Sequence, residues 1–189
     1  MPEISNKSLL IIMQGLSGSG KTTAGKKLAQ QLDGVMLRAD VERKRLFGLA
    51  PLAQSHQQDC SIYTREVTAK TFQNLLRKTE TLLSQDHAVI VDSAFLRKSE
   101  RDMFRKLADI TNIPFVIVKC LAPEEIMEQR IIQRLDSGAD ASEATVEVLE
   151  QQKGWEESLT AAELERAILL ETDQEDWESR LFFALPSIV

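Results

Sequence analysis

The chain has 189 residues, of which 43% are hydrophobic, so its length suits one domain over residues 1–189 with a continuous core. The formal net charge of −6 argues against a nucleic-acid partner, which usually requires a basic face, although a local basic cleft stays open. The two cysteines and two histidines have no metal-ligand spacing, and no apolar segment is long enough to cross a bilayer. We therefore expect a soluble cytoplasmic protein, either a monomer or a dimer, without a membrane partner.

The first expected strand, residues 8–14, is followed by a glycine-rich turn and an amphipathic helix that begins near Lys21. The turn fits the pattern G-x-x-x-x-G-K-[ST] in the strand–turn–helix context that this pattern requires. Its glycines allow backbone N–H groups to converge on phosphate oxygens, Lys21 is expected to reach the β- and γ-phosphates, and the Thr22 hydroxyl is expected to bind Mg²⁺. The sequence thus predicts an ATP site with Mg²⁺, while a preference for GTP stays open. The residues expected to bind the nucleotide are Gly15, Leu16, Ser17, Gly18, Ser19, Gly20, Lys21, Thr22 and Thr23.

The rest of the chain alternates between short apolar runs and helical patterns, which is typical of a parallel sheet with helices on both faces. In such sheets a ligand lies beyond the carboxyl ends of the strands, so polar residues at these ends are the first candidates for a site. The expected strands are residues 8–14, 35–37, 88–92, 114–120 and 167–171, and the expected helices cover about residues 21–32, 40–47, 55–85, 97–110, 123–135, 143–152 and 173–184.

The second strand is followed by three charged residues that we assign to the phosphate acceptor: Arg38, Asp40 and Arg43. Asp40 is expected to accept a hydrogen bond from a substrate hydroxyl and to act as its base. A residue at this point can also serve only as a helix cap. Arg43 either binds an anionic substrate or pairs with Asp40 on the surface.

The third strand ends in Asp92, a position at which an aspartate can hold Mg²⁺ or contact the substrate. The alternative is an aspartate that only caps a turn. Among the cations that follow, Arg97 lies near the strand end and is expected on the substrate side. The others, Lys98, Arg101 and Arg105, are expected on a solvated face.

Two arginines four residues apart, Arg130 and Arg134, share one helix face just before a break that contains Gly138. A break of this kind suits a mobile lid over about residues 130–145, from which arginines would stabilise charge on the transferring phosphate. The alternative is internal pairing with the glutamates of the same helix.

As a set, four segments resemble small predicted P-loop kinases that are often described as AAA-type ATP-binding proteins, found alone or fused behind an aminoglycoside-phosphotransferase-like domain. The segments are residues 15–23, 37–49 (Leu-Arg-Ala-Asp-Val-Glu-Arg-Lys-Arg-Leu-Phe-Gly-Leu), 89–96 (Val-Ile-Val-Asp-Ser-Ala-Phe-Leu) and 140–145 (Asp-Ala-Ser-Glu-Ala-Thr). More distantly, the chain is similar to polynucleotide 5′-hydroxyl kinases, zeta toxins, chloramphenicol phosphotransferases and gluconate kinases.

The resemblance covers residues 8–155 and implies a three-layer α/β/α sandwich with a five-stranded parallel sheet in the order 2-3-1-4-5. It also implies an aspartate after the second strand that acts on the acceptor hydroxyl, here Asp40, and a lid with arginines, here Arg130 and Arg134. The chain has Asp-Ser-Ala at 92–94 where Asp-Ala-Thr is expected, which leaves any role of Ser93 open.

The residues and the resemblance together predict a kinase that transfers the γ-phosphate of ATP to a hydroxyl of a small molecule. Two alternatives stay open: a polynucleotide 5′-hydroxyl kinase, and a nucleotide-dependent regulatory ATPase that binds a partner. Neither the acceptor nor the base-binding residues follow from the sequence.

Overall fold

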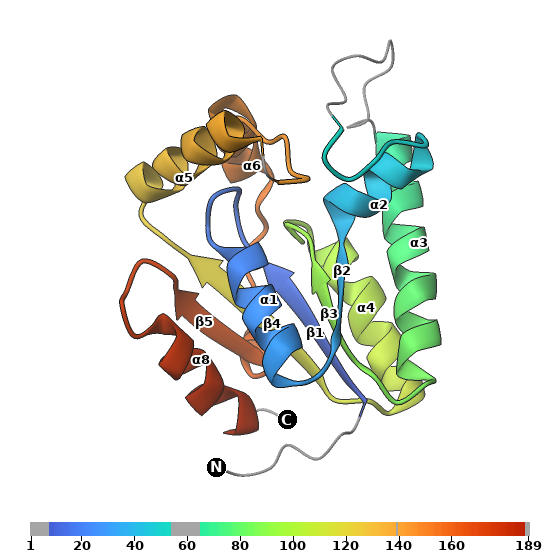
Figure 1. The fold of residues 1–189 in the computed structure, drawn as a ribbon. Coiled ribbons are helices and arrows are strands. Elements are labelled where there is room, and N and C mark those ends of the chain that lie inside the picture. Colours follow the sequence, from blue (N-terminus) through green and yellow to red (C-terminus); the bar gives the residue numbers. More distant parts are fainter. Residues whose placement is uncertain (1–7, 54–64, 139, 188–189) are drawn as a thin grey trace.

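The computed structural model describes residues 8–53, 65–138 and 140–187. Within them, five strands form one parallel sheet in the order β2-β3-β1-β4-β5, with helices on both faces (Figure 1). The predicted three-layer α/β/α fold and its strand order are thus confirmed. The strands are β1 (Leu9–Gln14), β2 (Val35–Arg38), β3 (Ala88–Asp92), β4 (Phe115–Leu121) and β5 (Ala167–Glu171).

The central strand β1 is buried along its whole length, which explains why it is a continuous apolar run rather than an alternating one. Its odd-numbered residues pack with α1 (Lys21–Gln31) and α8 (Trp177–Ala184) on one face of the sheet. Its even-numbered residues pack with α3 (Arg65–Leu83) and α4 (Lys98–Thr111) on the other face. The two hydrophobic clusters hold the sheet rigidly between the helix layers, and so fix the loops at its carboxyl edge.

Three further helices stand near that edge (Figure 1). Helices α5 (Glu124–Ser137) and α6 (Val146–Trp155) lie together above the strand ends on one side, and α2 (Ala39–Leu46) lies across from them next to the start of α3. The short helix α7 (Ala161–Leu164) precedes β5. Of the residues expected to form a lid, about 130–145, residues 130–137 lie in α5, and the others lie between α5 and the start of α6.

The boundaries of the lid helices differ from the prediction. Helix α5 continues to Ser137 and ends where Gly138 adopts a left-handed conformation with φ of 58°. Helix α6 starts at Val146 rather than near residue 143, and its cap is Thr145, whose side chain accepts a hydrogen bond from a backbone N–H of the first turn. Ser142, which directly precedes the predicted start of this helix, instead donates its N–H to the Asp140 carboxylate at 2.8 Å and belongs to a turn.

The start of α8 differs from the prediction, and the start of the predicted helix 55–85 is not tested. Helix α8 begins at Trp177 rather than at residue 173, because the residues after β5 form a turn that contacts the glycine-rich loop. Helix α3 is described from Arg65 onward, and residues 55–64 of the predicted helix lie outside the described part of the chain.

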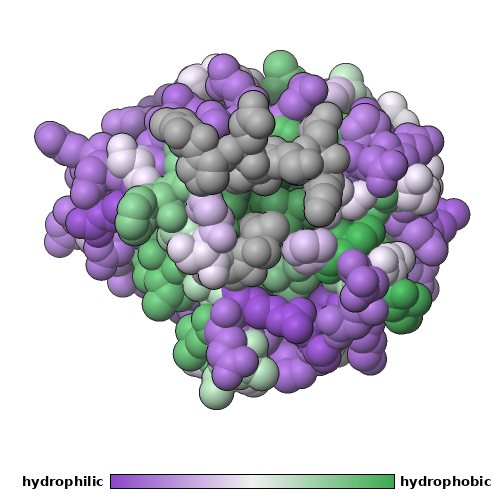
Figure 2. Space-filling view, turned by 90° about the horizontal axis from the view of Figure 1, so that it is seen from below, coloured by the Kyte–Doolittle hydropathy of each residue, from purple (hydrophilic) through white to green (hydrophobic). Residues whose placement is uncertain are grey.

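Figure 2 shows the opposite end of the molecule, where the chain termini lie. Hydrophilic residues cover much of this end, and hydrophobic residues gather in patches around the undescribed ones. No helix in the described ranges is long and apolar enough to span a membrane. The polar loops that were predicted to form a site lie at the other end, above the carboxyl edge of the sheet.

Candidate active site

The glycine-rich loop between β1 and α1 is packed so closely that side chains are excluded at several of its positions, as Gly18 and Gly20 show. Gly18 has a φ of 79°, and a Cβ there would lie 2.4 Å from the backbone oxygen of Met127 in α5. Gly20 has a φ of 87°, and a Cβ there would lie 2.8 Å from the Thr172 hydroxyl. Only glycine fits both the backbone conformation and the space, so the loop can form a concavity of backbone N–H groups directly before α1.

Lys21 lies at the start of α1 and folds back over this loop, where its Nζ donates to the Leu16 carbonyl oxygen at 2.7 Å. Burial lowers the pKa of Lys21, and the nearby Asp92 carboxylate opposes this shift only in part. A phosphate in the loop would supply the negative charge that the buried ammonium lacks. The position and charge of Lys21 therefore fit the predicted contact with a nucleotide phosphate.

Asp92 ends β3 and is 7% exposed. Its Oδ2 accepts hydrogen bonds from the Thr22 hydroxyl at 2.7 Å and from Arg38 Nε at 3.3 Å. Burial raises the pKa of Asp92, while Lys21, Thr22 and Arg38 counteract the shift. Mg²⁺ in phosphate sites is commonly bound by one or two protein oxygens together with phosphate and water oxygens, so the adjacent oxygens of Thr22 and Asp92 fit this ion.

Arg38 was predicted to contact the substrate, but both sides of its guanidinium are engaged by protein carboxylates. Besides the contact with Asp92, its Nη2 donates to Asp140 at 2.9 and 3.1 Å. For Asp140, burial favours a higher pKa, but the hydrogen bonds from Arg38 and from the Ser142 N–H outweigh it and lower the pKa. Arg38 thus links the end of β3 to the segment between α5 and α6.

A second ion pair joins the segment between α5 and α6 to α2. Lys44 of α2 lies 2.8 Å from Glu143, and the lysine side chain is almost fully buried. Its Nζ also donates to the Pro51 carbonyl oxygen at 3.1 Å. The segment between the lid helices is therefore tied to the β2–α2 region at two points.

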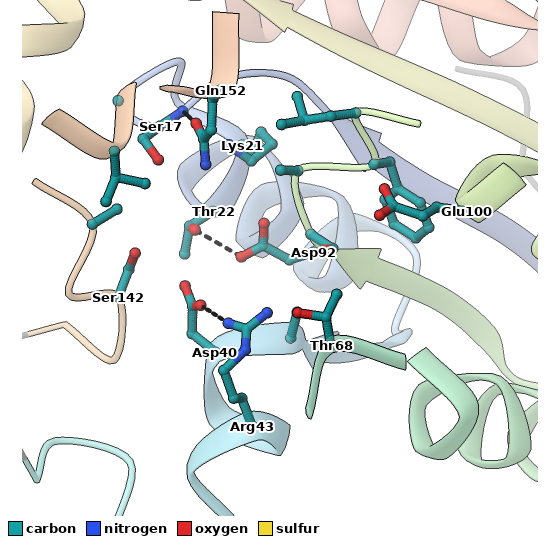
Figure 3. Close-up of a pocket in the computed structure, with 18 of the residues that line it drawn as sticks. Ser17, Lys21, Thr22, Asp40, Arg43, Thr68, Asp92, Glu100, Ser142 and Gln152 are labelled. Atoms are coloured by element: carbon teal, nitrogen blue, oxygen red, sulfur yellow. Dashed lines mark hydrogen bonds and ion pairs between the residues drawn. The ribbon is translucent and has the colours of Figure 1, made fainter. Parts of the chain in front are cut away.

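Asp40 lies inside the first turn of α2, where the N-cap residue is Arg38, so the alternative that Asp40 is only the cap is wrong. Its Oδ1 accepts a hydrogen bond from Arg43 at 2.8 Å, so of the two alternatives for Arg43 the pairing with Asp40 is present, but Arg43 is 10% exposed rather than on the surface. No residue in the described part of the chain donates a hydrogen bond to its other carboxylate oxygen. Figure 3 shows Asp40 pointing into the same space as Thr22 and Asp92.

The lid arginines contact backbone carbonyls and Thr172 rather than the glutamates of their own helix. Arg130 donates to the Gly18 oxygen at 3.2 Å and to the Thr172 hydroxyl and carbonyl at 2.9 and 3.0 Å. Arg134 donates to the Ala144 oxygen at 2.8 Å. In the described chain neither forms an ion pair, so internal pairing with the helix glutamates is wrong.

Sequence reasoning did not identify the contacts that Thr172 and Gln152 make with the glycine-rich loop. The Thr172 hydroxyl also donates to the Ser19 carbonyl oxygen at 2.9 Å and so joins the end of β5 to the loop. Gln152 of α6 accepts the Ser17 N–H at 2.8 Å. The position of Thr172 at a strand end could have identified it, whereas a glutamine in a polar helix carries no such signal.

Arg101 is also placed differently from the prediction. It is 1% exposed rather than solvated, and it pairs with Glu163 at 2.6 Å. It also donates to the carbonyl oxygens of Phe95 and Leu96 at 3.1 and 3.2 Å. Arg101 therefore holds the loop that connects β3 to α4.

All of these elements surround one cavity of about 1070 Å³. The loop and the lid arginines form one part of its wall. Helix α3 and the β3–α4 region form another part, where aromatic and apolar side chains lie beside the exposed Arg97. The lining residues of this part include Thr68, Phe72, Phe95, Arg97, Glu100 and Met103. The cavity thus has a phosphate-binding side and a mixed polar and apolar side.

Residues 10–159 match the sequence model of a protein family that is described as an AAA domain. Uncharacterised proteins of Mycobacterium bovis and Mycobacterium tuberculosis are 28% identical to the chain over 149 residues, which is 78% of this chain. The match spans only 30% of the length of these relatives.

Solved structures of several kinases are similar to the chain. A sugar kinase from Janibacter sp. HTCC2649 has a TM-score of 0.71 at 20% identity and covers 96% of both chains. A gluconokinase from Sinorhizobium meliloti 1021 has a TM-score of 0.67 at 17% identity, with 96% of this chain and 93% of that chain covered. The APS kinase of Mycobacterium tuberculosis in complex with AMPPNP and APS has a TM-score of 0.65 at 20% identity, with 94% and 95% covered. At these identities the likeness shows a common fold.

Proposed function

The chain belongs to the AAA domain family, and since it also has the fold of small P-loop kinases, we propose that it transfers the γ-phosphate of ATP to a hydroxyl of a small molecule. The observation that carries this proposal is the placement of Asp40 opposite Thr22 and Asp92 across one cavity (Figure 3). Phosphoryl transfer needs a bound donor, a positioned acceptor and a group that takes the acceptor proton. The cavity offers residues for each of these tasks.

The donor side consists of the loop and the start of α1. The loop N–H groups and Lys21 would hold the β- and γ-phosphates, with the N-terminus of α1 adding favourable charge. Thr22 and Asp92 would hold Mg²⁺, which supplies positive charge to the phosphate oxygens when it is bound. The Lys21 ammonium would stabilise the negative charge that moves from the γ-phosphate toward the leaving ADP during transfer.

The acceptor side is organised by Asp40. Arg43 holds one oxygen of the carboxylate at 2.8 Å, which leaves the other oxygen to accept a hydrogen bond from the substrate hydroxyl. During transfer, the hydroxyl oxygen forms a bond to the γ-phosphorus, the bond from that phosphorus to the bridging oxygen of ADP breaks, and the hydroxyl proton passes to Asp40. Arg43 thus orients the base rather than leaving it to rotate.

The charge distribution supports a small molecule rather than a polynucleotide. A single-strand channel needs a continuous basic groove with cations directed at the phosphates. Here Arg38 is bound by two carboxylates, and Arg43 is paired with Asp40. The mixed polar and apolar side of the cavity instead combines Phe72, Phe95 and other apolar groups with single polar side chains, as small-molecule sites do.

The experiment that tests the proposal is a screen of a metabolite pool with ATP and Mg²⁺, in which phosphorylated products are detected by mass spectrometry. The wild-type protein should produce one phosphorylated product or a few, and Lys21→Met should produce none. Absence of any ATP-dependent product with small molecules, together with salt-sensitive phosphorylation of an oligonucleotide, would replace the proposal by a polynucleotide kinase. A partner that binds differently to the ADP and ATP forms, without any product, would favour a regulatory module.

A further inference from the structure

Helix α6 of the lid touches the phosphate-binding loop through one side chain. The Ser17 N–H donates to Gln152 Oε1 at 2.8 Å, which joins two residues 135 positions apart in the sequence. Ser17 is the third residue of the loop, and Gln152 is a partly buried residue of α6 that lines the cavity. The contact places an uncharged amide group of the lid at the rim of the phosphate-binding concavity.

The partner of Gln152 fixes the orientation of its amide. A backbone N–H can only donate, so the group that faces Ser17 must be the carbonyl oxygen, and the NH₂ group must face the other way. Figure 3 shows the Gln152 nitrogen directed into the cavity, on the side of Lys21 and Thr22. Within the described residues, no acceptor bonds this NH₂ group. Its two donors therefore face the space in which a nucleotide phosphate would lie.

We propose that Gln152 is a further catalytic residue that donates a hydrogen bond to the γ-phosphate of ATP, an inference that rests on the proposed kinase function. The lid arginines hold other groups in this structure, Arg130 on Gly18 and Thr172, and Arg134 on Ala144. In the described part of the chain, Arg134 also keeps a buried Nε without a partner. Within the same residues, the NH₂ group of Gln152 has both donors unpaired and directed toward Lys21 and Thr22, and its oxygen is already anchored on the loop. It would therefore meet the transferring phosphate without a rearrangement of the lid backbone.

A competing role for Gln152 is purely structural, since its oxygen alone could hold the lid against the loop. The two roles predict different nucleotide preferences. An anchor of the loop affects ADP and ATP alike, whereas a donor to the γ-phosphate affects only ATP, because ADP has no γ-phosphate. The affinity ratio between the two nucleotides therefore separates the roles.

The test uses isothermal titration calorimetry of the full chain with MgADP and with a non-hydrolysable Mg–ATP analogue. Gln152→Met keeps the length of the side chain but removes both its donor and its acceptor. We expect this variant to bind the ATP analogue about tenfold or more weakly and to bind ADP within about twofold of the wild type, since a hydrogen bond to a charged group is roughly of this strength. The matched control is Gln133→Met, which makes the same change at an exposed position of α5. Thermal melting of each variant would establish that it is folded.

A second variant, Gln152→Glu, retains an oxygen that can accept the Ser17 N–H but loses the NH₂ donors. We expect it to lose affinity for the ATP analogue at least as strongly as Gln152→Met, because it also brings a negative charge near the phosphate. An unchanged ratio of the affinities for the ATP analogue and ADP in Gln152→Met would overturn the proposal, whether both affinities stay the same or both fall equally. A loss in Gln152→Glu alone would also overturn it, since simple charge repulsion would then explain the effect.

This experiment does not depend on an acceptor. If no small molecule is phosphorylated but Gln152→Met still loses affinity only for the ATP analogue, the proposed function fails and the contact with the γ-phosphate stands. If a product is found and the affinity ratio is unchanged, the proposed function stands and Gln152 has only a structural role. Where a product is available, we expect kcat to fall in Gln152→Met by about tenfold or more, with a much smaller change in KM for the acceptor.

Discussion

The sharpest prediction concerns Asp40, which we expect to be needed for transfer but not for nucleotide binding. Asp40→Asn preserves the shape of the side chain and an oxygen that can accept from Arg43, but it removes the base. General-base catalysis is worth about 10²- to 10⁴-fold, so we expect kcat to fall by roughly that factor, equivalent to about 3–5 kcal/mol. The loss of charge from the Asp40–Arg43 pair, whose side chains are 28% and 10% exposed, should cost only about 1 kcal/mol of folding stability.

The assay follows product formation with the acceptor identified by the metabolite screen, together with calorimetric titration of MgATP. The matched control is Asp33→Asn, which makes the same change in the turn between α1 and β2, where a left-handed residue suits asparagine equally well. Wild-type turnover in Asp40→Asn would refute the assignment of the base. A parallel loss of ATP affinity would show instead that Asp40 belongs to the donor side.

Three further predictions concern buried charges. Because burial raises the pKa of Asp92, the charged carboxylate makes the nucleotide-free fold less stable as pH rises above about 4. Asp92→Asn should therefore melt at or above the wild-type temperature at pH 7 but bind MgATP more weakly, and thermal melts with and without nucleotide would detect both effects. Arg101→Met should cost about 3–5 kcal/mol in urea unfolding, because it leaves Glu163 buried without its partner, and Arg101→Met combined with Glu163→Leu should recover part of this loss. Arg38→Met should speed amide hydrogen exchange in the segment around Asp140 by about tenfold, because a charged hydrogen bond to the lid is lost.

The strands were the most predictable part of the fold. The runs Ala88–Asp92 and Ala167–Glu171 form strands with the bounds expected from the sequence, because each is a short apolar run between turn residues. The start of α6 was missed because Ser142 and Thr145 are both suitable caps by residue type. Which of them caps the helix depends on Asp140, whose carboxylate takes the Ser142 N–H for a turn.

The candidate site was predictable in position but not in its connections. Thr22, Asp40 and Asp92 were expected together because the carboxyl ends of parallel strands meet at one edge of the sheet, and they line one cavity. The burial of Arg101 was not predictable, since its partner Glu163 is 62 residues away and its own helix carries charges at spacings typical of a solvated face. Contacts of this kind depend on tertiary packing, which leaves no local pattern in the sequence.

The two aspartates at the strand ends have the same chemistry in the sequence, and their neighbours assign them different tasks. Asp92 is 7% exposed, and its Oδ2 is already bound by Thr22 and Arg38, so a substrate hydroxyl could reach this oxygen only by displacing these groups. Asp40 is 28% exposed, and one of its oxygens faces the cavity without a donor from the described residues, so a hydroxyl can reach it directly. The more buried carboxylate therefore suits the metal ion and the more exposed one suits the acceptor, and exchanging the two roles would require a different set of neighbours around each.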